Sequence, residues 1–284
     1  MSEANGSASE TTETEANLDT GATGATAGGT LLSTVGLDVR YGSVQALFDV
    51  SIDVPAGSVV AVLGANGAGK STLARAVSGL VPSFGGRVTF DGRDITKAAP
   101  YDIRRAGLVH IPEGRGIFPG LSVQENLRMA VRRVGTPDQR RSAVDHAYEL
   151  FPRLAERRSQ RAGTLSGGEQ QMLGLSMAFM AQPALLMIDE LSLGLAPAIV
   201  EQLFTVLAGF RGDMTLVLIE QYVKRAHELA DQVVVLSYGQ VALNRAAADV
   251  TLAEIEKAYE LSVTEAGAPA DGAAEPDATS PSVS

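Results

Sequence analysis

A glycine-rich segment that ends in a lysine and a serine has the spacing needed for phosphate binding. It follows an apolar run over 59–63 and precedes a helical pattern over 70–78, the strand-to-helix context that this motif requires. The glycines let successive backbone N–H groups face phosphate oxygens, while Lys70 adds a positive charge and Ser71 a hydroxyl for Mg²⁺. We therefore predict a site for ATP and Mg²⁺ formed by Gly64, Ala65, Asn66, Gly67, Ala68, Gly69, Lys70, Ser71 and Thr72.

Two carboxylates end a second apolar run. Residues 185–188 lead directly into Asp189 and Glu190. A carboxylate at the end of a buried strand holds Mg²⁺ in ATPases with such a loop, so we predict Asp189 as a Mg²⁺ ligand beside Ser71. Glu190 is suited to orient or deprotonate the attacking water. By itself an acidic pair in this position is more often a solvated turn, and the phosphate loop is what favours the catalytic interpretation.

A third segment reads Leu165-Ser166-Gly167-Gly168-Glu169. Ser166 and Glu169 have the S-x-x-E spacing of a capping box, which predicts the start of a helix. A helix that begins with a serine and two glycines also leaves backbone N–H donors for an anionic group. The structural and the functional interpretation are therefore compatible.

Taken together, these segments resemble the ATP-binding cassette family, whose signature L-S-G-G-[EQ] lies between the phosphate loop and the Asp-Glu strand. The resemblance covers about residues 31–263 and implies two cassettes that bind ATP head to tail. It implies that Ser166, Gly167 and Gly168 contact the γ-phosphate on a partner cassette, and that Tyr41 stacks on adenine. The chain has a single phosphate loop, so the second cassette would be another chain, either related or a second copy.

Three positions depart from the family pattern. Glu113 stands where the family usually has a glutamine that senses Mg²⁺, and remains an oxygen ligand that Mg²⁺ accepts. Gln221 replaces the switch histidine, and can donate a hydrogen bond to the γ-phosphate but cannot carry a proton as imidazole does. Leu191 stands where proline is common, and we expect it to change only the stiffness of the loop and the turnover rate.

The first two departures, together with the residues around them, narrow the resemblance to the LivF-type ATPases of branched-chain amino-acid importers, and Leu191 departs even from the pattern of those ATPases. The segments that carry it are 112–115, 117–119, 192–197 and 220–221, of which 193–197 match the loop that crosses the cassette interface. The resemblance implies two membrane permeases, an external solute-binding protein and a location on the cytoplasmic face of the cell membrane. The alternatives are an importer for another solute, such as urea or a short amide, or a soluble regulatory cassette that does not transport.

The elements that must position these residues can be read from the apolar pattern. Strands alternating with helices predict an α/β fold with a parallel or mixed sheet core, and residues 120–160 predict a helical subdomain. Residues 172–188 carry no charge, but Pro183 interrupts them, so we predict a helix followed by a strand rather than a membrane span. The predicted strands cover 31–39, 48–54, 59–63, 185–188, 215–219 and 233–236.

Composition sets the limits of the folded part. The chain has 284 residues and no cysteine, which excludes disulfides and thiolate metal sites. Residues 1–30 and 264–284 are polar, acidic and of low complexity, so we predict disordered tails flanking one domain over 31–263. Those tails hold nine of the 33 acidic residues, leaving 24 against 23 Lys and Arg. A nearly neutral domain gives no electrostatic reason to expect nucleic acid as a partner.

Overall fold

Six strands form the central sheet in the computed structural model, which describes residues 29–114, 116–131 and 135–264. The sheet has the order β10-β9-β3-β8-β7-β6. All neighbours pair in parallel except β10, which runs antiparallel to β9. The strands are β3 (Val59–Leu63), β6 (Leu108–Ile111), β7 (Leu185–Asp189), β8 (Thr215–Glu220), β9 (Gln232–Ser237) and β10 (Gln240–Ala246).

The central strands are apolar throughout because both of their faces are covered. In β7, Leu186 and Ile188 pack with the helices on one side, while Leu185 and Met187 pack into the core on the other. Side chains of a strand alternate between faces, so a run of continuous apolar residues fits a strand buried on both. This is the physical reason that the short apolar runs could be identified as strands from the sequence.

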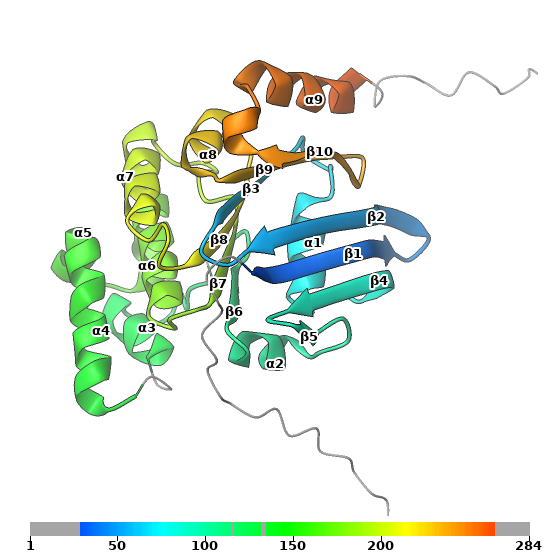
Figure 1. Cartoon of the computed structure of the whole chain (residues 1–284). Helices are drawn as coiled ribbons and strands as arrows, with labels where there is room; N and C mark the ends of the chain where they lie inside the picture. Colours follow the sequence, from blue (N-terminus) through cyan, green and yellow to red (C-terminus); the bar gives the residue numbers. More distant parts are fainter. Residues whose placement is uncertain (1–28, 115, 132–134, 265–284) are drawn as a thin grey trace, which may run out of the picture.

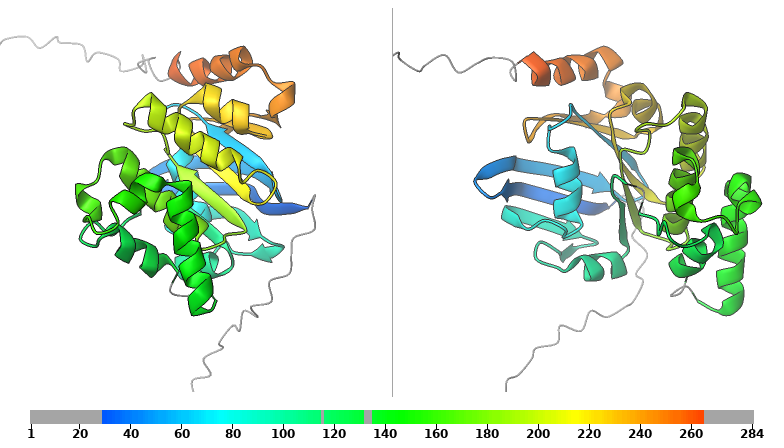
Figure 2. Two further views of the ribbon diagram at one scale, coloured as in Figure 1. Left: turned by 90° about the vertical axis from the view of Figure 1, so that its left-hand side faces the viewer. Right: turned by 180° about the vertical axis from the view of Figure 1, so that it is seen from behind.

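A second, antiparallel sheet and helix α1 (Lys70–Val77) cover one face of the central sheet (Figures 1 and 2). Its order is β2-β1-β4-β5. The sequence predicted two of these strands but not that they form a sheet of their own. Its strands are β1 (Thr30–Tyr41), β2 (Val44–Pro55), β4 (Ser83–Phe90) and β5 (Arg93–Asp94), and α2 (Pro100–Arg105) follows them.

Helices cover the opposite face (Figure 1). Capping boxes open four of them, at Ser122, Thr136, Ser166 and Thr251. The predicted α/β fold with its helical subdomain is confirmed. The helices are α3 (Val123–Ala130), α4 (Pro137–Leu150), α5 (Pro152–Glu156), α6 (Gly167–Phe179), α7 (Pro197–Ala208), α8 (Val223–Leu229) and α9 (Leu252–Thr264), with the short 3₁₀ turns η1 (Ala162–Thr164) and η2 (Ala247–Asp249).

The predicted domain limits at residues 31 and 263 remain predictions. Of the predicted tails, the structure describes residues 29, 30 and 264: Gly29 O accepts a hydrogen bond from Ala56 N (2.8 Å), Thr30 pairs with Pro55 in β1, and Thr264 is the last residue of α9. The other residues of the predicted tails lie outside the described residues. The uncharged run at 172–188 divides into the end of α6 and strand β7. Among the residues that the structure describes, no helix is both long and apolar enough to cross a membrane.

His110 on β6 is a partly buried histidine that the fold keeps neutral at pH 7. Ser78 Oγ donates its hydrogen to Ala74 O (2.6 Å), so His110 Nδ1 must be the donor in its 2.9 Å contact with Ser78 Oγ. The other ring nitrogen, Nε2, is buried and has no hydrogen-bond partner among the described residues. Burial lowers the pKa of His110 from 6.5 to about 4, and the charge of Arg75 acts in the same direction.

We predict that His110→Gln weakens the dependence of stability on acidic pH. The unfolded state takes up a proton near pH 6.5 and the folded state only near pH 4, so stability declines as the pH falls through this interval. The contribution of His110 reaches about 3 kcal/mol. Urea unfolding across this pH range measures it. Equal pH slopes for the wild type and the variant would exclude His110 as the source.

Candidate functional site

Three strands of the central sheet end side by side, and the predicted site residues follow them. Leu63 of β3 pairs with Glu220 of β8, and Asp189 of β7 pairs with Ile219 of β8. The N–H of Glu190 continues this ladder by donating to Ile219 O (2.9 Å). Because parallel strands end at the same edge, the phosphate loop and both carboxylates leave the sheet together.

The phosphate loop approaches the surrounding backbone so closely that two of its positions require glycine. A Cβ on Gly64 would lie 2.4 Å from Leu236 O, and a Cβ on Gly69 would lie 2.7 Å from Leu47 Cδ2. Both glycines have positive φ angles, 154° and 102°. The loop is therefore held against β9 on one side and β2 on the other, at the start of α1.

Lys70 is almost fully buried at the start of α1 and turns back onto the loop. Its Nζ donates to Gly64 O (2.9 Å) and Ala65 O (3.0 Å). Burial lowers the pKa of Lys70, while the negative charges of Glu190, Asp189 and Glu220 oppose that shift. The ammonium is thus already placed at the loop, among backbone carbonyls that phosphate oxygens could replace.

Asp189 and Ser71 meet where a divalent cation fits. Ser71 Oγ donates to Asp189 Oδ1 (3.2 Å), and the buried Oδ2 has no hydrogen-bond partner among the described residues. Burial raises the pKa of Asp189, and the neighbouring charges of Glu190 and Glu113 add to this. An unpaired buried carboxylate oxygen beside a hydroxyl fits a hard cation such as Mg²⁺.

Glu113 is less closely associated with Ser71 and Asp189 than these two residues are with each other. It is exposed, and within the described part of the chain no hydrogen bond joins it to Ser71 or Asp189, although its charge acts on Asp189. No cluster of three or more His, Asp or Glu residues suited to a metal occurs among the described residues. A Mg²⁺ ion here would therefore need further ligands from nucleotide phosphates and water, as is usual for this ion.

Gln221 joins the phosphate loop to the carboxylate pair. Its Nε2 donates to Asn66 Oδ1 (2.7 Å) and to Glu190 Oε1 (2.8 Å). Glu190 has a left-handed backbone, with φ of 54°, which is uncommon for a residue with a side chain and is found at functional sites. Two hydrogen bonds from one amide group thus join Gln221 to both Asn66 and Glu190, although Asn66 and Gln221 are 155 residues apart.

Glu220 holds the loop that follows Glu190, a role that the sequence did not reveal. It is only 1% exposed and accepts hydrogen bonds from Ser192 N (3.0 Å), Ser192 Oγ (2.6 Å) and Gln221 N (3.2 Å). Burial raises its pKa, and these hydrogen bonds oppose the rise. The only available sequence signal was a carboxylate at the end of an apolar strand, the same signal that identified Asp189.

The signature residues do not reach this site. Ser166 caps α6 with Gly167 and Gly168 in its first turn, and no hydrogen bond or ion pair among the described residues joins them to the phosphate loop. Tyr41 is 43% exposed at the end of β1, in the hairpin whose β2 arm touches Gly69. Its ring has no stacking partner among the described residues, and a nucleotide could lie against it.

Leu191 is part of the core, which corrects the expectation that it changes only loop stiffness. Its side chain is 1% exposed and packs in the core beneath the helices. The loop over 193–197 that follows is partly exposed, with Leu193 at 51%. Arg115, part of the segment after β6, lies outside the described residues.

We predict that Ser192→Ala destabilises the protein by leaving the buried Glu220 short of a donor. Loss of one hydrogen bond to a buried carboxylate costs about 1–3 kcal/mol. Urea unfolding gives the value, and Ser192→Thr, which keeps the hydroxyl, is the matched control. An alanine variant as stable as the wild type would show that the 2.6 Å contact contributes nothing.

Comparisons with known proteins agree with this geometry. The profile of the family described as "ABC transporter" matches residues 47–192. The chain is 41% identical to the branched-chain amino acid transport ATP-binding protein BraG of Pseudomonas aeruginosa, over 81% of this chain and 99% of that protein. It is 37% identical to the probable LivF protein of Archaeoglobus fulgidus, over 75% of this chain and 91% of that protein. It is 31% identical to BraF, also of Pseudomonas aeruginosa, over 74% of this chain and 89% of that protein.

Solved structures show the same fold. An ATP-binding subunit of an ABC transporter aligns with a TM-score of 0.73 at 27% identity, covering 81% of this chain and all of that one. A nucleotide-free cassette of an ABC transporter aligns with a TM-score of 0.68 at 25% identity, covering 81% and 95%. The chain belongs to the ABC transporter family, as one of its ATP-binding and ATP-hydrolysing cassettes.

Proposed function

We propose that this chain is the ATPase subunit of an importer for branched-chain amino acids, acting at the cytoplasmic face of the membrane. Its similarity to BraG, which extends over nearly the whole of that protein, supports the solute class. The observation that carries the proposed mechanism is the contact of Gln221 with both Asn66 and Glu190, because it links the phosphate loop to the residue that we assign as the base.

In this proposal the phosphate loop binds the triphosphate and Lys70 supplies its positive charge. The backbone N–H groups of residues 64–72 and the start of α1 face the phosphates. Lys70 exchanges the carbonyls of Gly64 and Ala65 for phosphate oxygens. Tyr41, in the hairpin beside Gly69, stacks on the adenine.

Ser71 and Asp189 would hold Mg²⁺, with Glu113 in the outer part of the site. Mg²⁺ bound there would supply positive charge that neutralises the phosphates. Glu190 orients the attacking water and accepts its proton. Gln221 keeps Glu190 in place and donates to the γ-phosphate once nucleotide is present. Phosphoryl transfer needs mainly such positioning and charge stabilisation.

The assembly that we propose contains a second cassette, two permeases and an external solute-binding protein. The absence of any hydrogen bond between Ser166, Gly167 or Gly168 and the phosphate loop, among the described residues, supports a partner cassette. That Pseudomonas aeruginosa has both a BraF and a BraG ATP-binding protein, and that this chain resembles both, supports a related partner.

We predict that Glu190→Gln retains ATP binding but reduces turnover by about a hundredfold or more, the contribution typical of a general base. The amide keeps the contact with Gln221 but cannot accept a proton. Nucleotide binding by fluorescence and phosphate release measure the two effects separately. Hydrolysis at the wild-type rate would show that Glu190 is not the base.

The assembly itself is tested by isolating the tagged chain from detergent-solubilised membranes of its host. We expect two multi-span permeases and a second cassette among the proteins identified by mass spectrometry. The solute-binding protein encoded beside them would then be titrated with leucine, isoleucine and valine, and with urea as the competing solute. Recovery of soluble proteins alone, while a control transporter stays intact, would contradict the transport function.

A further inference from the structure

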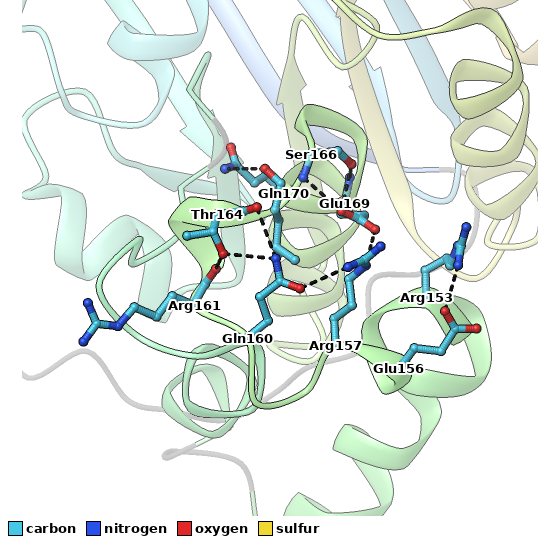
Figure 3. A network of polar contacts seen from close by, with 10 residues as sticks. Arg153, Glu156, Arg157, Gln160, Arg161, Thr164, Ser166, Glu169 and Gln170 are labelled. Atoms are coloured by element: carbon cyan, nitrogen blue, oxygen red, sulfur yellow. Dashed lines mark hydrogen bonds and ion pairs between the residues drawn. The ribbon is translucent and has the colours of Figure 1, made fainter.

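Arg157, directly after α5, lies between Gln160, which precedes the signature, and Glu169, the last residue of the signature (Figure 3). Its Nε is 2.6 Å from Glu169 Oε1, and its Nη1 donates to Gln160 Oε1 (3.1 Å). The Glu169 side chain is 13% exposed and that of Arg157 is 37% exposed, so this ion pair is better shielded from solvent than its neighbour Arg153–Glu156.

Both partners of Arg157 form hydrogen bonds with residues at or next to Ser166. On one side, Gln160 Nε2 donates to Thr164 O (3.1 Å) and Thr164 Oγ1 (3.0 Å), two residues before the signature serine. On the other side, Glu169 Oε2 accepts from Ser166 N (2.9 Å) and Ser166 Oγ (2.9 Å). One guanidinium therefore holds the chain on both sides of Ser166.

The charge of Glu169 makes this arrangement necessary for anion binding. A carboxylate in the first turn of α6 lies close to the N–H groups that would receive a phosphate, and like charges at short range repel. Burial alone would raise the pKa of Glu169, but the hydrogen bonds from Ser166 and the charge of Arg157 outweigh it and hold the pKa below its usual value. The carboxylate thus stays ionised.

We propose that Arg157 is a positioning residue for the signature: it anchors Glu169 and offsets its charge, so that the start of α6 can accept the γ-phosphate of a nucleotide on the partner cassette. This inference rests on the proposed head-to-tail pairing of cassettes. Arg157 itself touches neither nucleotide nor the reacting atoms. It acts through Glu169 and Gln160, which set the conformation of Ser166.

The test compares Arg157→Gln with Arg153→Gln in the full chain, purified with whatever subunits remain bound. Arg157→Gln should raise KM for MgATP about fivefold, the size expected for losing one partly shielded ion pair, with kcat at saturating ATP within about twofold. Arg153→Gln is the matched control, because Arg153 lies in the same segment but forms its ion pair with the exposed Glu156 and acts on Glu169 only through space, so its KM should change much less than that of Arg157→Gln. An unchanged KM for Arg157→Gln would overturn the inference.

A second variant separates charge compensation from general structural support. Combining Arg157→Gln with Glu169→Gln removes the uncompensated charge, and glutamine at this position still completes a capping box. We expect KM to return to within about twofold of the wild type. If Arg157 only stabilised the fold, the double variant would bind ATP as poorly as the single one, and that result would contradict our proposal.

The variant Ser166→Ala distinguishes failure of this inference from failure of the proposed head-to-tail pairing. If Ser166→Ala raises KM while Arg157→Gln does not, the signature meets nucleotide but Arg157 does not position it, and only this inference fails. If Ser166→Ala leaves both KM and kcat unchanged, the signature does not contact ATP, and the head-to-tail pairing on which the inference rests is wrong as well.

Discussion

The parallel register of β3, β8 and β7 is the constraint on which the rest of the site depends. Hydrogen bonding between these strands sets Leu63 opposite Glu220 and Asp189 opposite Ile219, so three chain segments leave the sheet at one edge. A shift of one residue in a strand would turn its side chains to the opposite face. The phosphate loop, the carboxylate pair and Gln221 meet only because this register is kept by cores on both faces of the sheet.

Charged side chains that are costly to bury lie together at the edge of the sheet that carries the site. Lys70, Asp189 and Glu220 are each no more than 4% exposed, and burial shifts the pKa of each toward the neutral form. They partly compensate one another, and Ser71 and Ser192 donate to the two carboxylates. Hydrophobic residues would fill this space at lower cost. Ionisable groups with shifted pKa values that lie together at a sheet edge are typical of a functional site.

Local interactions, and not the register of the central sheet, hold the signature in place. It belongs to the helical layer, where a capping box fixes the start of α6 and the contacts of Arg157 hold the adjoining turn. These interactions are local in sequence, and they keep the segment ordered without help from the phosphate loop. A surface prepared in this way suits recognition of a group that another chain presents, because little ordering entropy remains to be lost on binding.

The sequence by itself determined the local motifs. The phosphate loop, the Asp-Glu pair and the capping box at Ser166 each depend on consecutive residues, and the apolar runs identified β3, β7, β8 and β9 because strands covered on both faces lack polar positions. Periodicity does not encode strand order. The separate antiparallel sheet, the burial of Leu191, the bond between Ser192 and Glu220, and the contact of Gln221 with Asn66 therefore appeared only in the tertiary structure. These features join residues far apart in the chain, and only the packing of the whole sheet brings such residues together.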